Sequence, residues 1–364
     1  LYRENVALRE GISVLGGHNP VTWRRQPTVH VTTLTGSTQN PQGPDRLAVR
    51  ADGIVAQTEL SGFTINAEPA AAGGNSVALW IRNSGAGLEV RNNVVFGGEG
   101  GAGADGNPGT SGFGGLPGTV GVVSTIRTSC GVTRQGPAGG ARICNNPNGG
   151  TTDVSGGKGG DSLCPVYNTR NGSGGNGGNG GAGGLGGGHL RGSGSGCTVG
   201  LPADPRPGQS GGAGVDGPGG AGAANPAGTV DGASGQWRGQ GGAAGTHGGH
   251  GGGGGGGGAA AGIDAAAWEG NYYYGATGGS GGAGGCAGFS GTAGGGAGGS
   301  FAILMVFTNG APAGAGAMPV IEDNRFIRGR GGRGGRGGTG GGGGDAGLGR
   351  AGGLAVNAGT FGYC

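Results

Sequence analysis

Aromatic and charged side chains are both scarce in this sequence. Aromatic residues make up 5% of its 364 residues and charged residues 11%, and Lys158 is the only lysine. No run of 18 apolar residues occurs, so we predict no membrane span. The net charge of +3 is too small to imply a nucleic-acid partner. An ordinary side-chain core therefore cannot account for most of the chain.

Motifs for catalysis and metal binding are equally sparse. Among 19 acidic residues, the only local pair on a predicted repeat strand is Glu322-Asp323, and neighbouring strand residues point to opposite faces. His247 and His250 form an H-x-x-H within glycine, without a third or fourth ligand nearby. We therefore predict no enzymatic activity, no metal site and no cofactor.

The cysteines point to a compartment outside the cytoplasm. They number six, an even count with no C-x-x-C pair, which favours disulfides over free thiols or metal ligands. The candidates are Cys130, Cys144, Cys164, Cys197, Cys286 and Cys364. Their pairing stays open, although Cys130 with Cys144 and Cys164 with Cys197 are nearest in sequence. We expect a secreted, extracellular or cell-surface protein. Because the chain begins at Leu1 without Met, we also expect a mature or trimmed chain.

Glycine dominates what is present. There are 111 glycines, with eight consecutive ones at 251–258. Ordering the backbone costs about 1–2 kcal/mol per residue, and glycine offers no side-chain burial in return. The default interpretation is disorder. The alternative is that backbone N–H and C=O groups bond to neighbouring segments. An irregular glycine register and only 17 prolines exclude collagen, which leaves extended threefold helices lying side by side.

A three-residue period supports this alternative. Asn176, Asn179, Ala182 and Leu185 recur at every third position between glycines. A left-handed threefold helix places such residues on one edge, about 9.3 Å apart, and leaves two glycine edges for close neighbours. The pattern resembles the polyglycine II bundles of some phage adhesins and springtail antifreeze proteins.

The first hundred residues predict short strands separated by turn residues. The expected strands are 5–9, 12–15, 28–33, 47–50, 54–57, 62–66, 77–82, 88–91 and 94–96. Ser76–Ser84 followed by Leu88–Gly98 is echoed by Ser300–Asn309 followed by Val320–Gly329. Both copies lead into a glycine-rich run, and a third copy begins at Gly353. The glycine runs are therefore expected as insertions at one fixed corner of successive coils. Asn92, Asn93 and Asn324 are expected to stack at a coil corner.

Three phrases carry a family resemblance: Tyr2–Gly17, Leu60–Ile65 and Leu88–Asn93. They resemble coils of secreted bacterial right-handed parallel β-helix proteins of the pectin-lyase-like class. The resemblance implies an all-β, right-handed parallel β-helix solenoid with glycine-rich insertions packed as polyglycine II or polyproline II helices. It implies little about function, because that fold carries enzymes, adhesins and passive spacers.

The expected organisation follows the repeats. We predict β-helix coils at 1–97, a polyglycine-type insertion at 98–299, a coil at 300–328, an Arg/Gly-rich insertion at 329–352 and the start of a further coil at 353–364. We expect a non-enzymatic structural protein that joins copies of itself head to tail into a filament, a homopolymer. The alternative is an adhesin or glycan-binding module, with surface polysaccharide as partner. A spacer within a longer surface protein is a third option.

Two side-chain groups bear on these alternatives. Arg328, Arg330, Arg333 and Arg336 resemble an RGG box, but no aromatic residues are interleaved, so we expect a subunit-contact or polyanion-binding edge rather than a nucleic-acid site. Trp268, Tyr272, Tyr273 and Tyr274 are candidates for glycan contact. In so glycine-rich a chain, a small core that pins a loop is the favoured use of these aromatics.

Overall fold

The computed structural model describes residues 1–37, 43–193, 196–223, 228–308, 310, 312 and 317–354. They fall into two compact units. Unit 1 comprises Leu1–Asn107, Gly220–Ala244 and Thr292–Gly338, and unit 2 comprises Pro108–Gly219, Gly245–Gly291 and Thr339–Cys364. The described part is almost entirely strand and extended chain, with one short helix, α1 (Ala266–Glu269). No helix in these residues has the length and apolar character needed to cross a membrane.

Unit 1 contains three parallel sheets whose strands come from successive passes of the chain. The first is β1 (Tyr2–Arg3), β4 (Thr32–Thr35), β7 (Phe63–Asn66), β10 (Val94–Phe96) and β22 (Arg325–Ile327); the second is β2 (Val6–Ala7), β5 (Arg46–Asp52), β8 (Ser76–Arg82) and β20 (Ser300–Val306); the third is β3 (Val14–Leu15), β6 (Thr58–Ser61), β9 (Leu88–Arg91) and β21 (Val320–Glu322). All the pairings between these strands are parallel. These stacked parallel sheets are consistent with a solenoid.

Each pass visits the three sheets in the same order. Strands β5, β6 and β7 are followed by β8, β9 and β10, and after the long glycine-rich excursion by β20, β21 and β22. Phe96 at the end of β10 lies opposite Ile327 at the end of β22. The two long glycine runs therefore leave the same sheet at matching positions, as the sequence repeat predicts. A further antiparallel hairpin in this unit joins β16 (Gly228–Val230) to β17 (Trp237–Gly239).

The core of unit 1 is a narrow column of aliphatic side chains between the sheets. Leu60, Ile65, Leu79, Val90 and Val95 are fully buried, and the cluster extends from Leu8 to Ala302. Alternate residues on each short strand supply these side chains, because successive strand residues point to opposite faces. The apolar residues of the first hundred positions thus supply most of this core, and Ala302, Ile303, Met305 and Ile321 complete it.

A buried asparagine ladder fixes one corner of the coils. Asn93 is 1% exposed, and its side-chain amide donates to the carbonyl oxygen of Leu60 and to Asn324 Oδ1 (2.9 and 3.0 Å), while its Oδ1 accepts from Phe63 N–H. Asn324 repeats the pattern by donating to Val90 O. The expected stacking of Asn93 with Asn324 is confirmed, and it satisfies backbone groups where strands end.

A charged cluster spans two neighbouring coils of unit 1. Asp52 on β5 lies opposite Arg82 on β8, and Arg82 Nε donates to Asp52 Oδ1 at 2.8 Å. Arg50 pairs with the same carboxylate, and both guanidinium groups lie over the Trp80 ring at 5.1 and 5.3 Å. The hydrogen bond from Arg82 is the largest influence on Asp52 and lowers the pKa of its carboxyl, against an opposing effect of burial.

This cluster predicts a pH-dependent contribution to stability. Because the pKa of Asp52 is lowered in the folded protein, its stabilisation is present above its unfolded value of about 3.9 and is lost as the pH falls through the folded value. Asp52→Asn should lower the free energy of unfolding by about 1 kcal/mol at pH 7, since the pair is partly exposed. Urea titrations at pH 7 and pH 3 test this. An equal difference between the two proteins at both pH values contradicts it.

Two predicted strand positions are wrong. The segment 54–57 is not a strand: Ile54 is buried at a bend, where its N–H bonds to the Ser84 hydroxyl, and the strand is Thr58–Ser61, which pairs with β9. The segment 28–33 starts too early, because the N–H groups of Val29 and His30 bond back to Gln26 O in a turn. In both places the prediction followed the local apolar pattern. The strand position is instead set by pairing with the neighbouring coil, which fixes the register.

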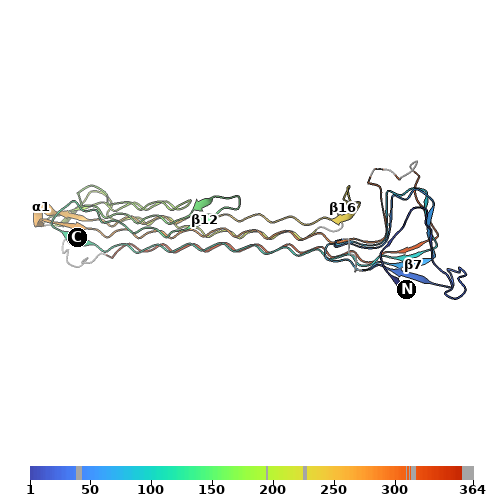
Figure 1. Cartoon of the computed structure of the whole chain (residues 1–364). Coiled ribbons are helices and arrows are strands. Elements are labelled where there is room, and N and C mark those ends of the chain that lie inside the picture. The colour runs from blue at the N-terminus through green and yellow to red at the C-terminus, as the bar shows by residue number, and fades with distance from the viewer. Residues whose placement is uncertain are drawn as a thin grey trace. The chain divides into compact units, whose positions relative to one another are not determined.

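Unit 2 holds short strands and many extended glycine-rich segments. Its five-stranded sheet has the order β11 (Thr125–Arg127), β19 (Asn271–Tyr274), β18 (Ile263–Ala265), β14 (Leu190–Ser193), β15 (Gly196–Val199), and a separate hairpin joins β12 (Ile143–Asn145) to β13 (Thr151–Asp153). The remaining segments run side by side as extended chain (Figure 1), and their many glycines contribute no side chains to a core. They need another source of cohesion.

That source is a backbone hydrogen-bond network with a three-residue repeat. Every third N–H of 109–124 donates to 339–354, from Gly109 to Thr339 O (2.7 Å) through Ser124 to Leu354 O (3.2 Å). Segment 339–354 donates at the same interval to 277–289, which donates in turn to 110–122. Three segments thus form a closed ring of donors and acceptors. In unit 1, segments 97–107, 292–298 and 327–338 form the same kind of ring.

The eight-glycine run lies at the centre of unit 2. Residues 251–258 exchange backbone hydrogen bonds with five segments: 157–160, 175–178, 181–184, 206–212 and 279–285. Cβ atoms built at Gly253, Gly255 and Gly256 would overlap the carbonyl oxygens of Ser155, Ala182 and Lys158, which belong to two neighbouring segments. A segment with neighbours on most of its edges has little space for side chains, and this accounts for most of the run, although a Cβ at Gly257 would meet its nearest atom only at 3.7 Å.

Two disulfides join distant parts of unit 2. Cys144 on β12 bonds to Cys286, and both are buried beside Val154. Cys130 bonds to Cys164. Neither bond joins the pairs nearest in sequence. None of the described cysteines, Cys197 included, is free, and Cys364 lies outside the described residues. The two disulfides indicate an oxidising, extracellular environment.

Candidate interaction surfaces

The first coil of unit 1 presents apolar side chains and unpaired strand edges. Strands β1, β2 and β3 each pair with one neighbour in the described residues. Around them is a hollow of about 640 Å³ lined by Tyr2, Val14, Leu34, Phe63 and Trp23 among others. Tyr2 is 57% exposed and Trp23 76%. We call this surface the coil-start face.

The opposite end of the same three sheets is formed by β20, β21 and β22. Each of these strands also has one paired neighbour among the described residues. Met305 and Ile321 are partly buried against the core, and Phe326 is 37% exposed. We call this surface the coil-end face. Both faces thus offer one unpaired backbone edge per sheet.

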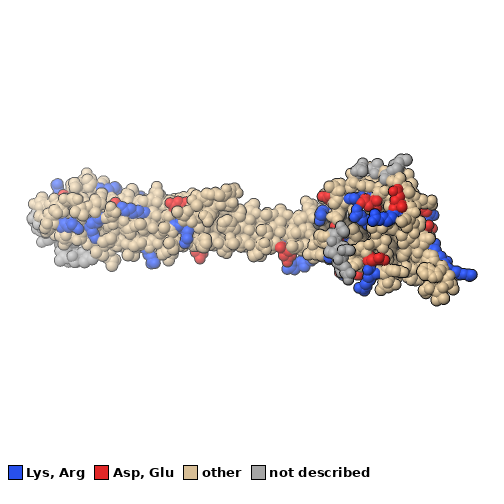
Figure 2. Space-filling model, in the orientation of Figure 1, with Lys and Arg blue, Asp and Glu red and all other residues tan. Residues whose placement is uncertain are grey.

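The arginine run lies along one edge of an extended segment of unit 1. Arg328, Arg330, Arg333 and Arg336 are all exposed. The carbonyl oxygens of the last three accept from Gly100, Gly103 and Gly106, so the three-residue repeat of the sequence is the repeat of the backbone bonds. Asp105 Oδ1 accepts from the Arg336 backbone N–H at 2.7 Å. On the visible face in Figure 2, the glycine-rich segments carry only scattered charges, while charges of both signs gather over the β-coils.

The tyrosine cluster is largely internal to unit 2. Tyr274 on β19 is 1% exposed, and Tyr272 and Tyr273 are partly buried. Tyr273 lies opposite Ile126 of β11 and Ile263 of β18. The Trp268 side chain lies outside the described part. This placement fits a small packing cluster that anchors the glycine-rich segments better than it fits an exposed sugar platform.

The histidines of unit 2 accept hydrogen bonds from backbone N–H groups. His250 Nδ1 accepts from Ala287 N–H (3.0 Å), and His247 Nδ1 accepts from Ser290 N–H (3.2 Å). His189, which sequence reasoning passed over, is fully buried and accepts from Gly262 N–H; burial lowers its pKa, against the opposing effect of that hydrogen bond. Within the described residues, no group of three or more His, Cys, Asp or Glu side chains is arranged to hold a metal ion.

The interaction surfaces therefore consist of backbone edges and glycine-rich segments rather than clusters of reactive side chains. Comparison of the chain with protein families, with curated proteins and with solved structures finds no match.

Proposed function

We propose that this chain is a non-enzymatic extracellular structural protein whose copies join head to tail into a filament. The observation that carries the proposal is the pair of open ends in unit 1. The same three parallel sheets end in β1, β2 and β3 on the coil-start face and in β22, β20 and β21 on the coil-end face. A second copy placed on either face continues all three ladders at about 4.8 Å per coil.

Such a contact joins two different surfaces. The coil-start face of one copy meets the coil-end face of the next, so the contact is heterologous and leaves both outer ends free to add further copies. It also covers Tyr2, Leu15 and Phe326, which are at least one-third exposed in the single chain. Burying apolar area contributes roughly 25 cal/mol per Å² before the costs of association.

We also propose a specific geometry for the coils of unit 1 and for the glycine-rich segments. The stacked sheets of unit 1 form a right-handed parallel β-helix, and the extended segments form polyglycine II-type bundles. The three-residue spacing of the backbone bonds supports the second point, since a threefold helix returns to the same edge at every third residue. The β-helix then provides polymerisation, and the glycine bundle is held together by its own backbone bonds.

Charged substitutions on the coil-start face test the proposal. Tyr2→Glu/Leu15→Glu should leave the fold intact, because both side chains are exposed, and should weaken association at least tenfold by placing carboxylates in the contact. Val199→Glu, at an exposed β15 position in unit 2, is the matched control and should associate normally. Sedimentation velocity over a concentration series measures this.

Two outcomes count against the proposal. One is wild-type protein that stays monomeric at every concentration reached. The other is association that the coil-start substitutions leave unchanged.

A further inference from the structure

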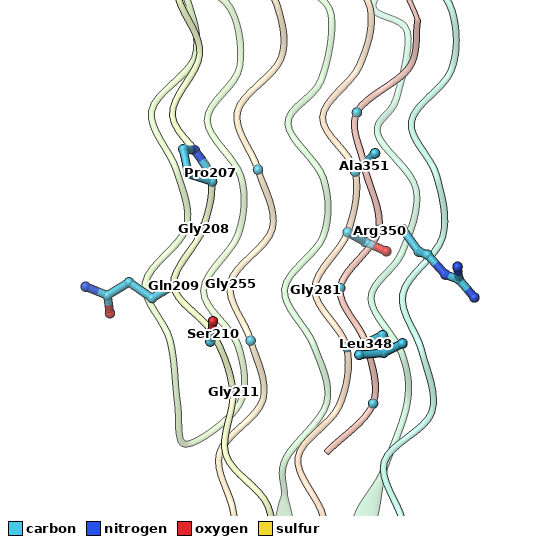
Figure 3. A pocket seen from close by; sticks show the side chains of 18 of the residues that line it. Pro207, Gly208, Gln209, Ser210, Gly211, Gly255, Gly281, Leu348, Arg350 and Ala351 are labelled. Carbon is cyan, nitrogen blue, oxygen red and sulfur yellow. The ribbon is translucent and has the colours of Figure 1, made fainter. Parts of the chain in front are cut away.

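Unit 2 contains a groove in which glycines make up more than half of the lining residues. It has a volume of about 550 Å³ and lies between segments 205–211, 254–258, 279–282 and 346–352. In Figure 3 the Gln209 and Arg350 side chains point away from it on opposite sides. We call it the bundle groove.

One wall of the bundle groove is segment 279–282. Further along the same segment, at 285–291, every third N–H donates to a carbonyl oxygen of 212–218. The N–H groups of Gly285, Gly288 and Gly291 donate to the carbonyl oxygens of Gly212, Val215 and Pro218 (3.3, 3.0 and 3.3 Å). The next two groups on that edge, the N–H groups of Gly279 and Gly282, have no hydrogen-bond partner among the described residues. Both glycines are buried, so these donors are held in place.

This row of backbone bonds is interrupted because the neighbouring segment has different hydrogen-bond partners before Gly212. Before Gly212 the chain bonds with 181–187 instead: Arg206 N–H donates to Leu185 O (2.8 Å) and Gln209 N–H to Ala182 O (2.9 Å). The position that 212–218 occupies beside 285–291 is therefore vacant beside 279–282.

The adjoining wall, formed by 346–352, shows the same interruption. The N–H groups of Gly214 and Gly217 donate to the carbonyl oxygens of Gly344 and Gly341, both at 2.8 Å. The next carbonyls along that segment, at Gly347 and Arg350, accept no hydrogen bond from the described residues. The free donors of 279–282 and the free acceptors of 347–350 are thus spaced three residues apart, like the bonded groups of 285–291 and 341–344.

Glycine occurs in this groove where the chain itself does not require it. Cβ atoms built at Gly257, Gly349 and Gly352 would lie 3.7, 3.8 and 3.4 Å from their nearest neighbours, which is ordinary contact. Elsewhere in the bundle most glycines are enforced by a carbonyl oxygen that a Cβ would overlap. Glycines at these three positions keep the groove open.

We infer that the bundle groove binds one extended, glycine-rich segment of a second copy of this chain. The same row is filled a few residues away by this chain's own 212–218, so a segment of that sequence type and direction matches the free donors and acceptors. About six residues fit along the wall, at about 3.1 Å per residue. The inference rests on the proposed self-association, and it adds a lateral contact that is independent of the coil faces.

The test uses the full chain with its coil-start face blocked by Tyr2→Glu/Leu15→Glu. On this background, Gly257→Leu/Gly349→Leu fills the groove and should reduce lateral association at least tenfold in sedimentation velocity. Gly342→Leu is the control. A Cβ at this position would lie 3.8 Å from its nearest atom, Asp216 Oδ1, and Gly342 does not line the groove. Hydrogen exchange of the Gly279 and Gly282 amides should slow with rising concentration in the control and not in the groove variant.

The results separate this inference from the head-to-tail proposal. If the blocked protein is monomeric and the Gly279 and Gly282 amides exchange rapidly at all concentrations, the groove does not bind a second copy, while filament formation by the unblocked chain is unaffected. If the blocked protein associates and the groove variant associates equally well, the lateral contact lies elsewhere and the inference is wrong.

Discussion

Gly256→Ala is expected to lower the free energy of unfolding by about 3 kcal/mol, the upper part of the range for overpacking substitutions. Gly256 N–H donates to Gly175 O, and Gly184 N–H donates to Gly256 O. A Cβ at this position would overlap Lys158 O and press on Gly157 O. To accept the methyl group, the neighbouring segment must move away and lengthen its own bonds. Urea-induced unfolding of the oxidised protein measures the change.

The adjacent residue provides the control. A Cβ at Gly257 would face the bundle groove, 3.7 Å from the nearest atom. Gly257→Ala should therefore be neutral or raise stability by about 0.4–1 kcal/mol, because alanine lowers the entropy of the unfolded chain. Equal losses at 256 and 257 would show that the segments are not packed as described.

Removing the disulfide between Cys144 and Cys286 should cost about 2–5 kcal/mol. The two cysteines are 142 residues apart, and the chain-entropy treatment gives a larger effect for a longer closed loop. The bond also connects β12 to segment 277–289, which forms the closed ring of backbone bonds with 109–124 and 339–354. Cys144→Ser/Cys286→Ser should therefore lower the unfolding midpoint strongly.

The second disulfide offers a comparison. Cys130→Ser/Cys164→Ser removes a bond across 34 residues and should cost less, since the loop is shorter. Thermal unfolding of both variants beside the wild type distinguishes them. An unchanged midpoint in Cys144→Ser/Cys286→Ser contradicts the role given to that bond.

Much of unit 1 could be predicted from the sequence. Alternating apolar residues and the repeated Asn93 and Asn324 positions located most strands and one corner contact. The register was harder, as 54–57 shows, because it depends on pairing with a coil that lies about 30 residues away. No local pattern contains that information.

The conformation of the glycine-rich segments could be predicted from the sequence, but their arrangement could not. The period of three in 174–185 indicates a threefold helix, and the backbone bonds have that spacing. Which segments are neighbours is set by backbone groups that all residues share, so the sequence offers little to choose between them. One signal was available: consecutive glycines at 251–258 indicate a segment with close neighbours on most of its edges, and this segment exchanges backbone bonds with five others.

The disulfides and the bundle groove were also beyond sequence reasoning. Cys286 is brought to Cys144 only by the stacking of segments that glycine spacing does not specify. The groove is a vacancy in that stacking, and its signal is glycine at Gly257, Gly349 and Gly352 without a steric need. Such positions cannot be told from enforced glycines until neighbours are known.

Electron microscopy of the purified chain at increasing concentration tests the central claim most directly. If copies join head to tail, we expect unbranched filaments that grow end to end through the coil faces, and their loss in Tyr2→Glu/Leu15→Glu. Dispersed single particles at every concentration, or filaments that persist in that variant, would contradict it.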